Sequence, residues 1–487
     1  MRAPTRFLSL TTWESTDRTS RFGMIANQLR RAGFQTWIIV GSLLSCVHGQ
    51  TQSRDAVLQS VDRATDFLSQ ITTHGGFVGI YSLDLKDRYG EGLYEKAASD
   101  EIWVQPPGTP SVGAAYLRLY HVTQNNRFLE MARRAGRALA WGQRLEGGWD
   151  HRVKVSDLSL DAERPRRVSG RCTFDDRITQ GALEFLMDLD HDLNEPWLDD
   201  AIKWGLDFML EAQFPNGAWS QWFPLRGGYH DYYTFNDRAI NDCISVLLKA
   251  YRSYGNSTFL EGAKRGADFI LLSQLPSPQA GWAQQYSHDL RPAAARAFEP
   301  AGVCSAATVN ALRSLLEVFE ASGEERFLAA FPAAEEWLEA SVLKQNQISQ
   351  LRYPDPEQRR RRMWARLYEL ETNRPIYGDR EAPRKVFYDL DGVSERERTS
   401  YGWQGTYGVD AVLKSYRELQ RIGSKTWRSL RSQNGNPPTR PPSAAKVAEI
   451  IEAQDEQGRW ITSNQIQIAT FVQNLNLLCD ALAVGDQ

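Results

Sequence analysis

The stretch EAQFPNGAW (211–219) returns near the C-terminus as EAQDEQGRW (452–460), with Glu, Ala, Gln, Gly and Trp in register. A shorter form of this phrase, in which glycine comes just before an aromatic residue, recurs along the chain. It ends at Phe77 in HGGF, at Trp149 in LEGGW and at Trp282 in PQAGW. Recurrence at a period of roughly 60–70 residues predicts a repeat architecture rather than a chance similarity.

Amphipathic runs flank these phrases on both sides. Before the phrase, apolar residues recur three and four apart, as in LDDAIKWGLDFMLEAQ (198–213) and FLEGAKRGADFILLSQ (259–274). After a loop, a second run follows, as in RITQGALEFLMDL (177–189), RAINDCISVLLKAY (238–251) and AATVNALRSLLEVF (306–319). Two helices per repeat predict helical hairpins that pack on their neighbours, and the absence of period-2 segments argues against a substantial sheet.

Hairpins of this kind form either an open solenoid or a closed ring. Closure buries both ends, and it places the longer loops, which all follow the glycine–aromatic phrases, around one mouth. We therefore expect an all-α fold, an α/α barrel or toroid, over residues from about 53 to 485. The proline-rich stretch NGNPPTRPPSA (434–444) is interpreted as a long connection before the last hairpin. Residues 50–487 are expected to form a single domain.

The N-terminal 49 residues have the pattern of an extension and a secretion signal. The apolar run FQTWIIVGSLLSCVHG (34–49) follows two arginines and is too short to span a bilayer. A start at Met24 gives this run a normal basic head, and cleavage after Gly49 fits the small-residue rule. LLSC, ending at Cys46, is an alternative lipoprotein box. A secreted or periplasmic protein is expected, with no membrane association apart from such an anchor.

The charge balance narrows the classes of partner. With 57 basic and 60 acidic side chains, the net charge of −3 supplies no broad positive field for nucleic acid. An anionic substrate must therefore be held by local cations. Beyond Cys46, four cysteines remain without Cys/His spacing for zinc, and buried thiols are expected rather than a metal site. We expect a monomer.

Two loops share the pattern Thr-Phe-x-Asp-Arg: TFDDRI (173–178) and TFNDRA (234–239). Asp176 and Asp237 come just before helical runs, where a carboxylate typically caps backbone N–H groups. The same spacing, counted on from Phe235, reaches Phe298 in RAFEPA, where proline takes the aspartate position and Arg296 is added. Convergence of the three loops would give two carboxylates facing an arginine. Such a site suits calcium, which accepts irregular arrays of oxygen ligands.

A further stretch, MWARLYELETNRPIYGDR (363–380), places Arg366, Arg374 and Arg380 among aromatic residues. Three guanidinium groups can bind carboxylates bidentately, which suits an acidic polysaccharide. The alternative is a set of interhelical salt bridges to nearby acidic residues.

Together TFDDRIT, QFPNGAWSQWFPL, YYTFNDRAIN, ARAFEPAG, WARLYELETNRPIYGDR and YGWQGTYG resemble the pectate lyases of polysaccharide lyase family 10, from about Phe174 to Gly408. The resemblance implies an α/α barrel that cleaves polygalacturonate by anti β-elimination with Ca²⁺. It implies calcium and substrate carboxylate at Asp176 and Asp237, Arg296 as the base, and Arg366 and Arg380 as substrate clamps. Arg374 lies in a matching motif and is assigned to substrate binding.

The resemblance also leads to expectations for Arg177 and for the pKa of Arg296, and two alternative functions stay open. Arg177 is bulkier and more cationic than the family pattern, and it is expected to perturb calcium affinity. Calcium, Arg366 and Arg380 are expected to lower the pKa of Arg296 in the substrate complex, which predicts an alkaline optimum. The alternatives are a glycoside hydrolase that uses paired carboxylates on the same fold, and a non-catalytic carbohydrate-binding protein.

Overall fold

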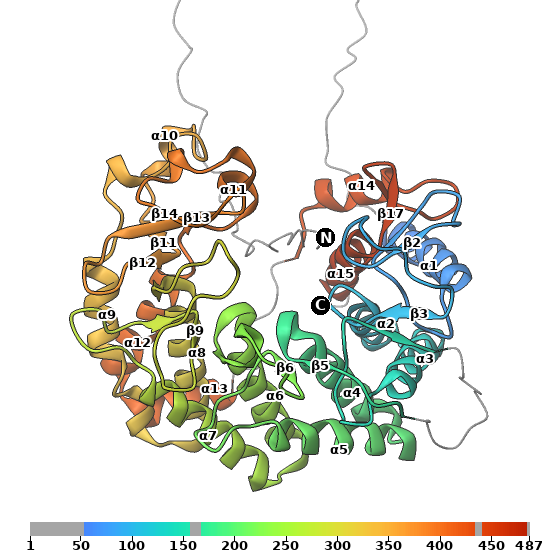
Figure 1. The fold of residues 1–487 in the computed structure, drawn as a ribbon. Helices are drawn as coiled ribbons and strands as arrows, with labels where there is room; N and C mark the ends of the chain where they lie inside the picture. The colour runs from blue at the N-terminus through green and yellow to red at the C-terminus, as the bar shows by residue number, and fades with distance from the viewer. Residues whose placement is uncertain (1–52, 156–166, 434–440, 485–487) are drawn as a thin grey trace, which may run out of the picture.

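The structure is a computed structural model that describes residues 53–155, 167–433 and 441–484. The extension and secretion signal assigned to residues 1–49 lie outside the described residues, as does most of the proline-rich connection. Helices dominate the described chain, and Figure 1 shows them following one another around a common centre.

Two sets of helices build the ring. The first set, called the inner helices here, pack on one another in succession: α15 (Ile468–Val484), α2 (Thr109–Thr123), α4 (Ile178–Leu193), α6 (Ala239–Tyr254), α8 (Ser305–Ser322) and α12 (Val409–Ile422). The second set, the outer helices, pack on them: α1 (Arg54–Ile71), α3 (Asn126–Gly142), α5 (Pro196–Glu211), α7 (Ser257–Leu272), α9 (Phe331–Ala340), α13 (Ser424–Gln433) and α14 (Ala444–Glu452). This arrangement is the α/α barrel that the repeats predict.

The two ends of the described chain are joined to each other. Helix α1 packs on α14 and α15, and α15 packs on α2. Strands β16 (Ile461–Thr462) and β17 (Gln465–Gln467) pair with β1 (Ile80–Tyr81) and β2 (Arg88–Tyr89) in one sheet. The guanidinium of Arg54 donates to the Leu482 carbonyl at 2.9 Å. In Figure 1 the C-shaped outline is open elsewhere, between α11 (Glu395–Ser400) and α14.

The recurring tryptophans explain the glycine–aromatic phrase. Each indole is buried, and its Nε1 donates to a carbonyl near the end of the preceding outer helix: Trp149 to Leu139, Trp219 to Met209, Trp282 to Ile270 and Trp460 to Ile450, at 2.7–2.9 Å. The glycine lets the backbone approach closely. A Cβ on Gly217, which has φ +93°, would lie 2.0 Å from the Arg265 carbonyl oxygen. The phrase therefore closes each outer helix and turns the chain toward the next inner helix.

Short strands line the connections between the helices. One sheet runs in the order β14 (Ala382–Phe387), β13 (Pro375–Asp379), β12 (Leu367–Tyr368), β10 (Val303–Cys304) and β8 (Trp282–Ala283). The two-stranded pairs are β3 (Glu101–Trp103) with β4 (Arg152–Lys154), β5 (Cys172–Thr173) with β6 (Trp222–Phe223), β7 (Tyr233–Thr234) with β9 (Gln285–Tyr286), and β11 (Trp364–Ala365) with β15 (Gln404–Gly405). Short helix α10 (Pro356–Arg359) and α11 belong to the same connections. Most of these strands are too short to produce a period-2 pattern.

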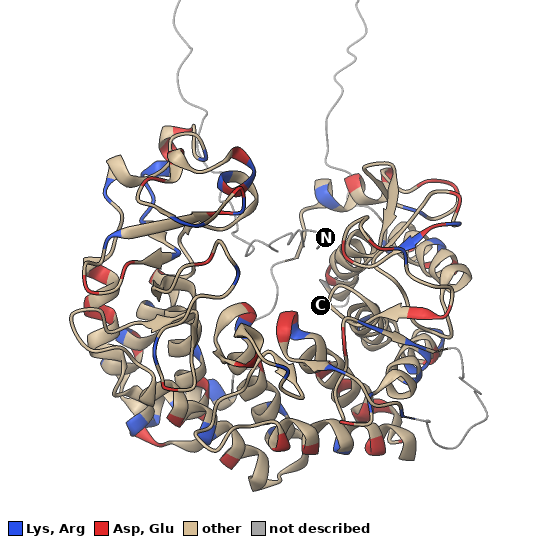
Figure 2. Cartoon of the chain, viewed as in Figure 1, with Lys and Arg blue, Asp and Glu red and all other residues tan. Residues whose placement is uncertain are grey.

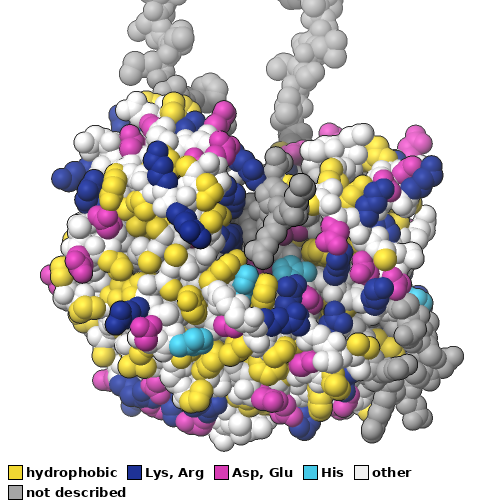
Figure 3. Space-filling view, viewed as in Figure 1, with side chains coloured by type: hydrophobic (Ala, Val, Ile, Leu, Met, Phe, Trp, Pro, Cys, Tyr) yellow, Lys and Arg dark blue, Asp and Glu magenta, His cyan; other side chains and the backbone are white. Residues whose placement is uncertain are grey.

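Four cysteines of the described chain are free and buried, as expected: Cys172, Cys243, Cys304 and Cys479. Within the described ranges, the longest apolar helices fall short of what a membrane span requires. Figure 3 shows basic and acidic side chains interspersed over the face that it draws, in keeping with the small net charge.

Candidate active site

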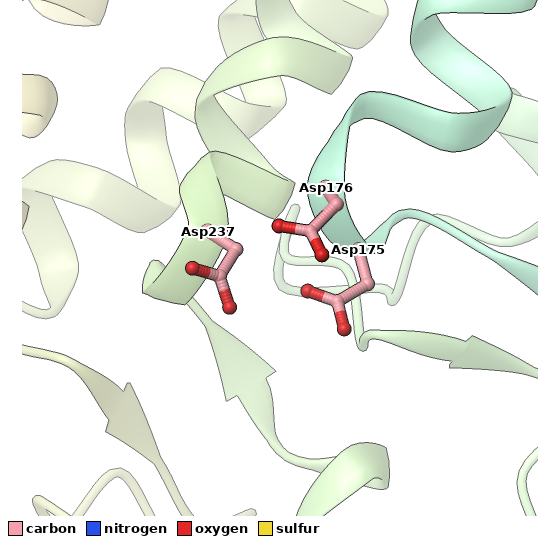
Figure 4. A group of neighbouring side chains, drawn as sticks. All are labelled: Asp175, Asp176 and Asp237. Carbon is pink, nitrogen blue, oxygen red and sulfur yellow. The ribbon is translucent and has the colours of Figure 1, made fainter. Parts of the chain in front are cut away.

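Three aspartates form the centre of the candidate site. Each of Asp175, Asp176 and Asp237 offers a carboxylate oxygen, and these oxygens lie within 4.8 Å of one another. Figure 4 shows Asp237 facing the other two from a neighbouring turn. The turns are two single-turn 3-10 helices, η1 (Asp175–Arg177) and η3 (Asn236–Arg238), directly before inner helices α4 and α6. In Figure 2, acidic segments lie at two helix ends that face the middle of the ring.

The backbone of both turns is left-handed at the aspartate. Asp176 has φ 47° and Asp237 has φ 46°, a conformation that costs a non-glycine residue roughly 1–2 kcal/mol. The residues that cap α4 and α6 are the following arginines, and neither helix has a side-chain cap hydrogen bond. The two carboxylates thus do not cap the helices, which was the alternative interpretation of their positions. Strain of this kind is concentrated at functional sites.

Burial and mutual repulsion dominate the electrostatics of the cluster. Burial, followed by the charges of Asp237 and Asp176, raises the pKa of Asp175 well above its usual value. Burial, followed by the charges of Asp237 and Glu91, likewise raises the pKa of Asp176. Three carboxylates at this spacing are difficult to ionise together without a compensating cation.

Two buried glutamines support the cluster. Gln105 Nε2 donates to Asp176 Oδ2 at 3.0 Å, and Gln221 Nε2 lies 3.3 Å from Asp175 Oδ1. The Oε1 atom of each glutamine is buried and has no hydrogen-bond partner among the described residues. The site therefore offers carboxylate and amide oxygens, the donors that calcium prefers when it takes about six to eight oxygen ligands. The residues present fit a calcium ion.

Arg296 joins the cluster from a different connection. Its Nη2 donates to Asp237 Oδ2 at 3.1 Å, and its Nε lies 3.4 Å from Glu299 Oε2. The predicted convergence is thus present, but Phe298 is not the structural counterpart of Phe235. In the third repeat, strand β10 leads directly into α8, and Arg296 belongs to the longer connection between β9 and β10. The extra length lets this connection reach back over the neighbouring turn.

The surroundings of Arg296 keep it protonated in this structure. Burial acts to lower the pKa of Arg296, but the charges of Glu299 and Asp237 outweigh it and raise the pKa above its usual value. Glu299 is itself buried and accepts a hydrogen bond from the Tyr401 hydroxyl at 2.5 Å. The nearest charged groups are therefore carboxylates. Calcium, Arg366 and Arg380 are expected to lower this pKa only when a substrate complex forms.

Arg366 borders the same turn as Asp237. Its Nη2 donates to the Asn236 side-chain oxygen at 3.2 Å, and its guanidinium lies over the Tyr401 ring, 4.9 Å from the centroid. Asn236 is adjacent to Asp237, and Tyr401 contacts Glu299, the partner of Arg296. Arg366 therefore lies beside both the aspartate cluster and the connection that carries Arg296.

Arg380 borders the Arg296 connection. Its guanidinium lies 3.8 Å from the centroid of the Phe298 ring, and it forms an ion pair with buried Glu397. Arg374, which lies between Arg366 and Arg380 in the same motif, is exposed, and its guanidinium lies 3.8 Å from the centroid of the Tyr388 ring. Among the described residues, no hydrogen bond or ion pair connects Arg374 to the aspartate cluster.

Sequence reasoning missed five residues that complete the site: Asp175, Gln105, Gln221, Glu299 and Tyr401. Asp175 was visible as the first half of the Asp-Asp pair, and Glu299 as the acidic residue of ARAFEP. Gln221 and Tyr401 lie in the motifs QFPNGAWSQWFPL and YGWQGTYG, whereas Gln105 lies outside the six motifs. Only the packing of distant connections brings these three residues to the cluster.

Comparison with known families decides the relationship. The family model described as pectic acid lyase matches residues 143–412, more than half of the 487 residues. The chain belongs to this family. The matched range contains the three aspartates, Arg296 and the arginines of the 363–380 motif, so the resemblance inferred from the six motifs is confirmed. This pectic acid lyase family member is therefore a polysaccharide lyase. No curated protein sequence matches it.

Solved structures with a similar arrangement include a mutant of a family 10 polysaccharide lyase from Cellvibrio cellulosa in complex with trigalacturonic acid. The identity is 22%, with 64% of this chain and 98% of that chain covered and a TM-score of 0.48. A D-mannose isomerase is 13% identical, covering 89% and 98%, with a TM-score of 0.45. An α-mannanase of glycoside hydrolase family 76 from Bacteroides thetaiotaomicron is 10% identical, covering 90% and 97%, with a TM-score of 0.45.

Proposed function

We propose that the protein is a secreted, calcium-dependent pectate lyase that cleaves α-1,4-polygalacturonate by anti β-elimination. The observation that carries this proposal is the contact between Arg296 and the partly buried three-aspartate cluster: Arg296 Nη2 lies 3.1 Å from Asp237 Oδ2. A member of the pectic acid lyase family with hard oxygen donors beside an arginine has the groups that elimination on a uronate requires.

Substrate binding is assigned to the arginines that border the cluster. Arg366 and Arg380 each present a planar guanidinium, which binds a carboxylate through two parallel hydrogen bonds. Both are held in place by aromatic rings, so little side-chain freedom remains to be lost when a uronate binds. Arg374 is proposed to bind a more distant uronate, since its guanidinium lies on an exposed ring.

The reaction breaks two bonds and forms one double bond. The base removes the proton at C5 of a galacturonate, the C4–C5 double bond forms, and the glycosidic oxygen at C4 leaves and takes up a proton from water. A calcium ion held by Asp175, Asp176 and Asp237 would supply positive charge for the carboxylate that becomes electron-rich in the transition state. Arg366 and Arg380 orient the uronate so that its C5 proton faces the base.

Arg296 is proposed as that base, and it must first lose its own proton. Asp237 and Glu299 oppose this loss in the structure, because they raise the pKa of Arg296. Neutralisation of Asp237 at an occupied cation site removes one of these two influences, while the neighbouring guanidinium of Arg366 disfavours a second positive charge. A base of this kind works best at alkaline pH.

The test is an absorbance assay with polygalacturonate, with and without a chelator. Elimination creates an unsaturated product that absorbs in the near ultraviolet, and the signal must disappear when calcium is removed. A hydrolase on the same fold would release reducing ends without this absorbance, and a binding protein would release neither product. An activity that releases reducing ends alone would refute the proposal.

Secretion is proposed on the strength of the apolar run at 34–49. Sequencing the N-terminus of the protein recovered outside the producing cell tests it. A mature chain that begins near Gln50 is expected, whereas a lipid-modified Cys46 at the first position would show an anchored form.

A further inference from the structure

Arg177 and Arg238 directly follow Asp176 and Asp237, and both arginines bind one further aspartate, the buried Asp242. Arg177 Nη1 lies 3.2 Å from Asp242 Oδ1, and Arg238 Nη2 lies 2.9 Å from the same oxygen. Arg238 Nε also donates to this oxygen at 2.9 Å. Asp242 lies on inner helix α6 and its side chain is 0% exposed. One carboxylate therefore holds both turns that carry the cation ligands.

The backbone of these turns requires such support. In each turn the aspartate and the following arginine are both left-handed, with φ 47° and 59° at Asp176 and Arg177, and 46° and 63° at Asp237 and Arg238. Two consecutive non-glycine residues in this region are unfavourable, and they persist only where surrounding contacts determine the conformation. The contacts made by the two arginine side chains anchor the second residue of each pair.

The same arginines extend the contact across three inner helices. Arg177 forms an ion pair with Glu184 on α4, and Arg238 Nη1 donates to Asn310 Oδ1 on α8 at 3.1 Å. Asp242 on α6 is the residue that the two arginines share. The network therefore fixes the spacing of α4, α6 and α8 next to the turns that carry the ligands.

We propose that Asp242 is a positioning residue that sets the separation between Asp176 and Asp237 for the bound cation. This role also accounts for Arg177, which the sequence predicted would perturb calcium affinity. The guanidinium of Arg177 forms ion pairs with Asp242 and Glu184. Its positive charge is therefore compensated within this network and does not act on the three-aspartate cluster. The inference rests on the proposed function, because it concerns the cation site.

The experiment is calcium titration calorimetry on the full chain after chelator treatment. Asp242→Asn keeps the size of the side chain and removes its charge, and calcium binding is expected to weaken at least tenfold, with a lower Tm. The double variant Asp242→Asn/Arg238→Gln removes a partner from each side of the contact. Its Tm is expected to recover part of the loss because the partly exposed guanidinium of Arg238 no longer lacks its carboxylate partner. Its calcium affinity is expected to stay weak.

A matched control uses the ion pair between two other inner helices. Asp480→Asn removes the ion pair between Arg118 on α2 and Asp480 on α15, in which Arg118 Nη2 lies 2.5 Å from Asp480 Oδ1. This variant is expected to lose Tm while binding calcium like the wild type. Recovery of both Tm and calcium affinity in the double variant would show a purely structural role, and so would unchanged affinity in Asp242→Asn.

The two proposals fail in different ways. A wild-type chain that binds no calcium refutes the cation site itself. If the wild-type chain binds calcium and the Asp242→Asn variant or the double variant binds it with the same affinity, only the positioning role is refuted. If circular dichroism shows that Asp242→Asn does not fold, the double variant decides the question by the same affinity criterion.

Discussion

The substitution Asp176→Asn is expected to stabilise the metal-free protein and to abolish its response to calcium. Asparagine has nearly the same shape, tolerates the left-handed backbone of this position, and offers an oxygen that accepts the hydrogen bond from Gln105. The change therefore removes charge from the cluster while it leaves the turn intact.

The size of the effect follows from the spacing of the carboxylates. Two charges 4.8 Å apart repel by roughly 3.5 kcal/mol at an effective dielectric constant of about 20. Asp176 faces two such neighbours, but it can escape the repulsion by taking up a proton. From an unfolded pKa near 3.9, protonation at pH 7 costs about 4 kcal/mol, which sets the upper limit. The positive charge of Arg296 compensates part of the repulsion and lowers the expected gain below this limit. We therefore expect the substitution to raise the free energy of unfolding by about 1–4 kcal/mol.

The pH dependence has a definite sign. Because the pKa of Asp176 is raised by folding, the folded state binds more protons than the unfolded state above pH 4. The wild-type metal-free protein should therefore lose stability from this group as the pH rises from about 4 through the folded pKa, and Asp176→Asn should lose less. At pH 4 and below, the two proteins should differ little in this respect.

Urea denaturation of chelator-treated protein at pH 5 and pH 7.5, with and without calcium, measures these effects. Asp207→Asn is the control, because Asp207 is an exposed carboxylate on α5 paired with Lys203, and its loss should change stability by less than about 0.5 kcal/mol. The reasoning would be refuted by an Asp176→Asn variant that is less stable than the wild type without calcium. It would equally be refuted by a variant that calcium stabilises as much as the wild type.

Three further predictions concern the base, the repeat and the substrate arginines. Arg296→Lys should lower kcat on polygalacturonate by about 100-fold or more while oligogalacturonate still binds, because a lysine does not reproduce the guanidine geometry; near-normal turnover would show that another group is the base. Trp219→Phe should lower the free energy of unfolding by about 1–3 kcal/mol, because the buried Met209 carbonyl loses its indole donor; unchanged urea denaturation would contradict this. Arg380→Gln should raise KM for polygalacturonate more than Arg374→Gln does, since Arg380 contacts the Arg296 connection and Arg374 does not; steady-state kinetics on both variants would expose the reverse order.

The repeating fold was predictable because its signal is physical and local. In four repeats a tryptophan donates from its indole to the end of an outer helix, and the sequence repeats the glycine and tryptophan; the first repeat has Phe77 instead. The repeat at Trp364 makes the same contact, from Nε1 to the Leu338 carbonyl at 2.7 Å, but its sequence does not show the phrase. The other repeats have a glycine one or two positions before the aromatic residue, whereas Trp364 follows Arg362 and Met363.

The site was predictable only in part. Asp176, Asp237 and Arg296 were found from motifs, and the structure brings all three together. Spacing failed for the third loop because the connection that carries Arg296 is longer than its counterparts. Gln105 escaped notice because it precedes the matched range and reaches Asp176 only through the packing of α2 against α4.

The pairing of α1 with α14 and α15 has a consequence for biosynthesis. A chain that leaves the ribosome or a translocation pore N-terminus first exposes the apolar side of α1 long before its partners exist. The packing of α1 on α14 and α15 can therefore form only after α15 has emerged. Loss of even the terminal helix should leave a chain that chaperones and proteases recognise as unfinished, whereas a circular permutant joined across these neighbouring ends should assemble normally.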